Sequence, residues 1–262
     1  SLKHQWSLNQ GTGTAVTDTA DVSNQTLTAI AGGWAGAGTF TPGTSTLKMT
    51  GASKNINYLS GEVIGDLQIS STGTTLNCVD VTDGTDTFTC ESVTIDDGKT
   101  FTATSGTIIC TGENASSYTW SNDNSGLGKF IHNKGTVKID FNTPNANDHA
   151  DLRESEFYNL EIDMNSADYN CNIRDVAGNL ISFFGNVTIT NGDLLATTAG
   201  DAWTFHGLLN IAANGSFNDA AAITGDVIHH GLITNLGTYK IKDTVTAKMN
   251  GGIRQLGTLT IA

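Results

Sequence analysis

The sequence FIHNKGTVKIDF at Phe130–Phe141 returns in two variants, LITNLGTYKIKD at Leu232–Asp243 and GIRQLGTLTIA at Gly252–Ala262. Each copy has an apolar residue, a polar pair, Gly-Thr, and then a strand in which apolar and polar residues alternate. The glycines of the last two copies are Gly237 and Gly257. A short strand unit that recurs at such an interval buries its apolar side only against its neighbours, so the pattern predicts a solenoid.

A second recurring phrase supports the same prediction. It reads SVTIDDGKTF at Ser92–Phe101, NVTITNGDLL at Asn186–Leu195 and LLNIAANGSF at Leu208–Phe217. Each strand places two apolar residues on one face with a polar residue between them. The apolar residues expected to face inward in the last two copies are Val187, Ile189, Leu209 and Ile211.

The composition indicates a folded all-β chain. Its 262 residues include 30 glycines but only 2 prolines, and 38% are hydrophobic. Proline is scarce in stacked strands because every interior strand must donate its N–H groups to a neighbour. The formal net charge of −13 argues against binding nucleic acid or an anionic membrane through a broad basic face. We interpret it as a solvated acidic surface, with divalent-cation binding as the alternative.

The four cysteines are Cys78, Cys90, Cys110 and Cys171. No C-x-x-C pair is present, so a zinc site has little support. Cys90 and Cys110 are separated by the same interval as Gly237 and Gly257, which is the spacing of one coil. We expect these cysteines to be free and buried, and a disulfide stays open as the alternative.

The N-terminal segment, up to Phe40, differs from the rest of the sequence. It resembles the opening of concanavalin-like or laminin-G-like jelly-roll domains, and the matching residues are Trp6, Gly11, Gly13, Asp18, Leu27, Thr28 and Trp34. The remainder of a jelly roll does not follow, so no ligand-binding residue carries over. We expect residues 1–38 to form a short cap or docking segment, with Trp6 and Trp34 as candidate assembly contacts.

From Thr39 to Ala262 the sequence resembles a repeat of phage, virus and microbial surface proteins. In that repeat a G-T-F strand and a T-L-x-x-x-G strand precede a polar turn and an L-x-I strand. The matching residues are Gly38, Thr39, Phe40, Thr46, Leu47, Gly51, Leu67 and Ile69, with a second copy of the last element at Phe157, Leu160 and Ile162. The resemblance implies an all-β fold in which residues 39–262 form a right-handed parallel β-helix.

Two polar stretches interrupt the repeats, at Asn142–Glu156 and Glu113–Gly128. Long excursions from a regular scaffold often carry binding contacts. The second stretch contains Tyr118 and Trp120, which we identify as a candidate carbohydrate or partner contact. Packing of Trp120 in the core is an equally open alternative.

No residue pattern indicates an active site, a cofactor site or a metal site. Glu161 and Asp163 flank the apolar Ile162 and should project from one outer face, as catalytic acids do in β-helix polysaccharide enzymes, but exposed acids are expected on any acidic rod. The sequence DVTDGTD at Asp80–Asp86 could wrap calcium, although it lacks EF-hand spacing and is expected to be a polar turn. His229 and His230 are adjacent on a strand and should point to opposite faces.

These observations favour a non-catalytic structural protein, a fibre, spike or decoration component of a phage or virus particle or a surface display protein. It would be found in the virion, or outside the cell or on the cell surface. A cellular surface adhesin is one alternative, and a polysaccharide-binding or polysaccharide-degrading tailspike is the other. The sequence opens without a charged-then-apolar leader, which would suit a virion protein made in a host cytoplasm, although a removed leader stays open.

We expect a homo-oligomer, preferably a trimer, because an open end of a β-helix is an adhesive edge. Other virion or surface proteins are the expected partners, and glycans are a further candidate ligand. The sequence ends on the strand LGTLTIA, where Leu259 and Ile261 are candidate assembly contacts.

Overall fold

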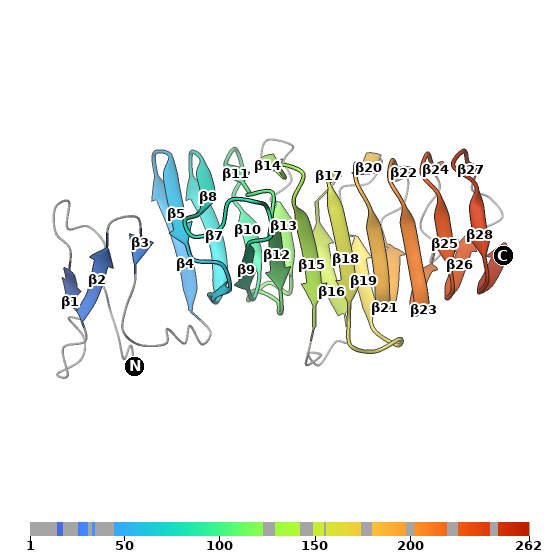
Figure 1. Cartoon of the computed structure of the whole chain (residues 1–262), viewed down its shortest axis with the longest axis horizontal. Coiled ribbons are helices and arrows are strands. Elements are labelled where there is room, and N and C mark those ends of the chain that lie inside the picture. Colours follow the sequence, from blue (N-terminus) through green and yellow to red (C-terminus); the bar gives the residue numbers. More distant parts are fainter. Residues whose placement is uncertain are drawn as a thin grey trace.

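The chain folds into a long stack of short strands (Figure 1). The computed structural model describes residues 15–17, 26–30, 33–34, 45–122, 129–141, 149–154, 156–173, 180–197, 202–218, 225–241 and 246–261, and for residues 15–34 the backbone alone. Every regular element in these ranges is a β-strand. No helix in them is long and apolar enough to cross a membrane.

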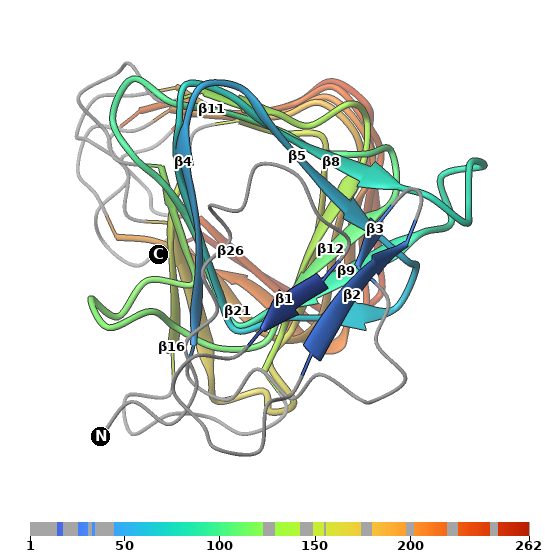
Figure 2. The same cartoon turned by 90° about the vertical axis from the view of Figure 1, so that its left-hand side faces the viewer.

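Three faces surround one interior when the stack is viewed along its axis (Figure 2). The strands of each face pair in parallel with the equivalent strands of the coils before and after. The first face contains β4 (Thr46–Gly51), β7 (Asp66–Ser71), β10 (Val93–Ile95), β13 (Trp120–Asn122), β16 (His149–Arg153), β19 (Asn170–Ile173), the second halves of β21 (Val187–Ala196) and β23 (Leu209–Asn218), β26 (Thr238–Ile241) and β29 (Thr258–Ile261).

The second face consists of two parallel sheets in succession. They are β5 (Lys54–Tyr58), β8 (Thr74–Cys78), β11 (Thr100–Thr102) and β14 (Lys129–Ile131), and then β17 (Glu156–Phe157), β20 (Leu180–Phe183), β22 (Ala202–Phe205), β24 (Val227–His229) and β27 (Ala247–Met249). The third face contains β6 (Glu62–Val63), β9 (Thr87–Cys90), β12 (Thr107–Cys110), β15 (Thr136–Asp140), β18 (Asn159–Asp163), the first halves of β21 and β23, β25 (Ile233–Asn235) and β28 (Ile253–Gln255). The predicted all-β solenoid is therefore confirmed, and its right-handedness stays a prediction.

The length of the coils varies along the stack. Among the shortest on the first face is the coil that brings Leu67 into register with Leu47. A much longer one brings Leu152 into register with Trp120, because that coil includes one of the polar stretches. Strand alternation continues through the long coils, since a strand slipped by one residue would turn its apolar side chains outward.

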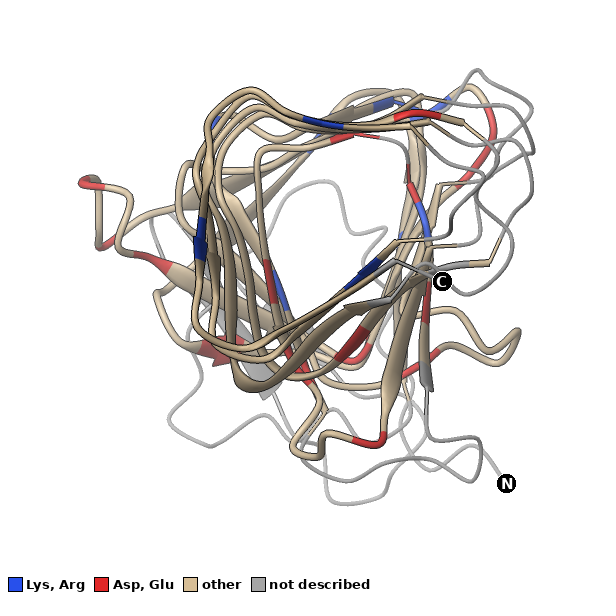
Figure 3. Ribbon diagram, turned by 90° about the vertical axis from the view of Figure 1, so that its right-hand side faces the viewer, with Lys and Arg blue, Asp and Glu red and all other residues tan. Residues whose placement is uncertain are grey.

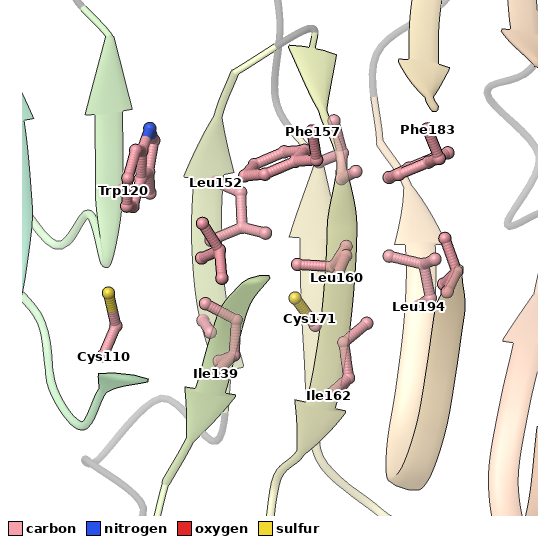
Figure 4. Close-up of a cluster of buried hydrophobic side chains, with 14 of the residues drawn as sticks. Cys110, Trp120, Ile139, Leu152, Phe157, Leu160, Ile162, Cys171, Phe183 and Leu194 are labelled. Atoms are coloured by element: carbon pink, nitrogen blue, oxygen red, sulfur yellow. The ribbon is translucent and has the colours of Figure 1, made fainter. Parts of the chain in front are cut away.

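The interior is a set of apolar columns (Figure 4). Val187, Ile189, Leu209 and Ile211 are fully buried, as predicted. Aromatic rings stack between coils on the second face; Phe157 lies on Phe183, and Phe183 lies on Phe205 with ring centroids 4.8 Å apart. Each coil therefore buries its apolar side against the next one, which is the arrangement that the repeats imply.

The four cysteines are free, as expected, but the expected burial is wrong for Cys78, which is only partly buried. Cys90 and Cys110 are registered partners on β9 and β12, and both are fully buried. The contact with Cys110, followed by burial, raises the pKa of the Cys90 thiol. Burial likewise raises the pKa of Cys171.

The N-terminal segment contributes a separate antiparallel sheet of β1 (Ala15–Thr17), β2 (Thr26–Ile30) and β3 (Gly33–Trp34). This sheet lies at the β4–β5 end of the solenoid (Figures 1 and 2). Trp6 and the side chain of Trp34 lie outside the described residues. The assignment of residues 1–38 as a cap or docking segment stays a prediction.

Candidate functional site

Five aromatic side chains follow one corner of the solenoid. Each is the residue directly after a strand of the second face, and we call them the corner ladder: His132, Tyr158, Phe184, His206 and His230. The ring centroids of Phe184 and His206 are 5.4 Å apart at an interplanar angle of 8°. Those of His206 and His230 are 5.2 Å apart at 12°. The described corner thus carries offset-stacked rings from coil to coil.

At its N-terminal end the ladder is less regular. The ring centroid of His132 lies 5.4 Å from that of Tyr158 and 5.7 Å from that of Phe184, and the ring planes are tilted by 43° in both pairs. His132 and Tyr158 are half-buried, whereas Phe184, His206 and His230 are exposed. Burial lowers the pKa of His132, which favours its neutral imidazole.

A column of glycines holds the ladder in place. Gly185, Gly207 and Gly231 directly follow Phe184, His206 and His230. A Cβ at Gly207 would lie 2.2 Å from the carbonyl oxygen of Gly185, and one at Gly231 would lie 1.9 Å from that of Gly207. Only glycine fits where successive backbones approach this closely.

This geometry determines which ring atoms a ligand can reach. Neighbouring rings cover one another's faces, so a ligand would meet mainly their edges, and Nδ1 of His132 already accepts a hydrogen bond from the Lys134 amide at 3.1 Å. The ladder therefore offers ring edges rather than a flat platform on which a sugar could stack. The sequence signal for it is an aromatic-glycine pair, Phe184-Gly185, His206-Gly207 and His230-Gly231, placed before an apolar strand.

The expected contact site at Tyr118 and Trp120 is not formed as an exposed pair. Trp120 is fully buried. Its ring centroid lies 4.7 Å from that of Phe130 and 6.1 Å from that of Phe157. Of the two alternatives that the sequence left open for Trp120, the structure shows packing in the core, and its polar neighbours on β13 are buried with it. Tyr118 is half-buried beneath the Arg153 guanidinium, which lies 4.6 Å from the ring centroid and donates to the hydroxyl at 2.6 Å.

One outward acid of β18, Asp163, belongs to a ladder of polar side chains. Asp163 accepts a hydrogen bond from Asn191 at 2.7 Å, and Asn191 accepts one from Asn214 at 3.2 Å. One coil earlier, Lys138 pairs with Asp140 at 2.6 Å. Although burial alone favours the neutral amine, the bond to Asp140 and the surrounding acids raise the pKa of Lys138. Glu161 is exposed, as the alternation predicts.

The acids of Asp80–Asp86 point to separate partners. Asp80 accepts from the Ser60 amide at 2.8 Å, and Asp83 accepts from the Thr85 amide at 3.0 Å. Asp86 is 3% exposed and accepts from the hydroxyls of Tyr58 and Thr104. Burial and the bond to Asp86 raise the pKa of Tyr58. Within the described ranges no three His, Cys, Asp or Glu side chains could hold a metal ion together.

At the last described strand, β29, the side chain of Leu259 is 44% exposed and registers with the buried Tyr239. Ile261 registers with Ile241, and its side chain lies outside the described residues. Their role in assembly stays a prediction. Lys and Arg lie singly around the coils among Asp and Glu (Figure 3).

No protein-family model, curated protein or solved structure matches this chain. Its function must therefore be argued from its own residues.

Proposed function

We propose that this chain is a non-catalytic structural protein, a rod that is part of a phage or virus particle or is displayed on a microbial surface. One observation carries the proposal: side chains outside the rod form coil-to-coil columns just as those inside do. The corner ladder and the Asp163–Asn191–Asn214 ladder are the two clearest examples. Surface groups that bind one another stabilise the stack.

The backbone supports a mechanical role. Parallel strands stack about 4.8 Å apart, and each interior strand hydrogen-bonds to the coil before and the coil after it. The resulting rod holds its two ends at a fixed distance, which is the property that fibres and spikes require. The resemblance of residues 39–262 to particle and surface proteins agrees with this use.

One of the two acids that could serve a polysaccharide enzyme, Asp163, supports the structural role instead. Asp163 is held by the Asn191 amide, and Lys138 neutralises the nearby Asp140. We expect purified protein to leave acidic and neutral polysaccharides uncleaved. Release of reducing ends that disappears in Glu161→Gln or Asp163→Asn would establish the enzymatic alternative.

Fractionation tests the location. An antibody against this chain should detect it in purified particles or on intact cells of the source culture, and proteolysis of intact samples should remove it. Detection only in the soluble interior of cells would overturn the proposal. Light scattering on the purified protein tests the expected homo-oligomer, for which a trimer predicts three times the mass of one chain.

A further inference from the structure

His229 is a buried histidine in the core of the rod. It is the last residue of β24, its side chain is 1% exposed, and its ring lies on Phe205 with centroids 4.5 Å apart at 10°. Met249 is its registered partner in the next coil. The adjacent His230 faces outward, as the sequence predicts for neighbouring residues of one strand. Neither the fold nor the proposed function requires an ionisable group at this inner position.

One imidazole nitrogen of His229 has a partner and the other has none. Nε2 lies 2.7 Å from the Tyr239 hydroxyl, while Nδ1 is buried without a hydrogen-bond partner. A bare lone pair is less costly to bury than an unpaired N–H, so the neutral ring should carry its proton on Nε2 and donate to Tyr239. Protonation would place a second N–H at Nδ1, which has no hydrogen-bond acceptor.

Among the described residues, no carboxylate is placed against His229. Its neighbours there are Phe205 from β22, Tyr239 from β26 and Met249 from β27. The ion pair between Asp226, directly before β24, and Lys248 of β27 is half exposed. An imidazolium at this position would therefore be buried without compensation.

We propose that His229 makes its part of the rod acid-sensitive: its protonation opens the coils carrying β22, β24 and β27 while the coils further toward the N-terminus stay closed. Opening should be local because each coil of a solenoid contacts only its neighbours, so a weakened coil opens without unfolding the whole chain. The proposal is independent of where the protein is displayed, so its failure would leave the structural role standing.

The pKa shift of His229 determines the pH range over which its coil opens. Burial lowers the pKa of His229 from 6.5 to about 4. An unfolded or opened coil binds the proton more readily than the closed coil, so stability is complete above pH 6.5 and is lost as the pH falls toward 4. Between pH 7 and pH 5 this shift raises the opening equilibrium constant about twentyfold.

Hydrogen exchange read by mass spectrometry tests the proposal on the full chain. Peptides from residues 202–249 should show an opening constant about twentyfold higher at pH 5 than at pH 7, after correction for intrinsic exchange. Peptides from residues 66–110 of the same molecules are the internal control and should change by less than about threefold. An equal rise in both regions, or none in 202–249, would overturn the proposal.

Matched variants test whether the pH dependence of opening comes from the His229 imidazole. The double variant His229→Phe/Tyr239→Phe removes the titrating ring and its partner while keeping aromatic packing, and its opening should no longer depend on pH. His229→Gln serves the same purpose if the double variant does not fold. A pH effect that persists in the folded variant would refute the assignment. In the unaltered protein, an NMR titration that finds His229 protonating near pH 6.5 would refute it as well.

Discussion

Replacing Gly231 by alanine should force apart two coils at the corner that carries the ring ladder. The added Cβ would lie 1.9 Å from the carbonyl oxygen of Gly207 and 2.3 Å from its carbonyl carbon, and real Cβ contacts stay above 3.0 Å. Both atoms belong to backbone and cannot rotate away as a side chain would. The backbones must therefore separate by about 1 Å at this corner.

That separation acts on hydrogen bonds beside the corner. The His230 amide donates to the Phe205 carbonyl at 2.8 Å, and the Leu209 amide donates to the Leu232 carbonyl at 3.0 Å. Each bond contributes about 0.5–1.5 kcal/mol, and overpacking adds a similar penalty. We expect Gly231→Ala to lower the free energy of unfolding by about 3 kcal/mol. This corresponds to a melting temperature lower by about 6–12 °C.

Thermal unfolding followed by circular dichroism measures this loss, and Gly73→Ala is its matched control. The nearest atom to a Cβ at Gly73 is the Ser53 hydroxyl oxygen at 3.7 Å, an ordinary contact. This variant should melt within about 2 °C of the unaltered protein, since it adds no overlap. If Gly231→Ala melts together with Gly73→Ala, the close approach of the backbones at the corner is refuted.

Three further outcomes follow from the packing. A thiol reagent should modify only Cys78 in the folded protein, because the other three cysteines are fully buried, and all four in urea; a second reactive thiol before unfolding would contradict this. Trp120→Ala should lower the free energy of unfolding in urea by about 3–5 kcal/mol and Trp120→Phe by clearly less, whereas equal, small losses would contradict a core position. Tyr58→Phe leaves the buried carboxylate of Asp86 with one donor fewer and should cost about 1–3 kcal/mol, so an unchanged urea midpoint would argue against that bond.

The alternation of apolar and polar residues was enough to predict the strands and their inward faces. Ile189 and Ile211 follow from a period of two, and the pairing of Cys90 with Cys110 follows from their separation by one short coil. These are local properties, because they depend on one strand or on one short coil. The regular coils therefore match the sequence-based expectation closely.

The features that the sequence left open or did not indicate depend on contacts between coils of unequal length. Trp120 lies among polar residues in the sequence, yet Ser121 and Asn122 are buried with it, so local polarity was a poor guide to exposure. The corner ladder stacks Phe184 on His206 and His206 on His230, although the first interval along the chain is shorter than the second. No fixed repeat length brings these rings together; their alignment becomes visible only once the strand register is known.

His229 and His230 illustrate how such a fold separates neighbours in the sequence. One ring is buried against Phe205 in the inner column, and the other lies against His206 in the corner ladder. The two columns share a backbone, so they cannot move independently where these residues meet. If protonation of His229 opens its coil, His230 must leave His206 in the same step. The acid response would then change the exposed corner of the rod as well as its interior.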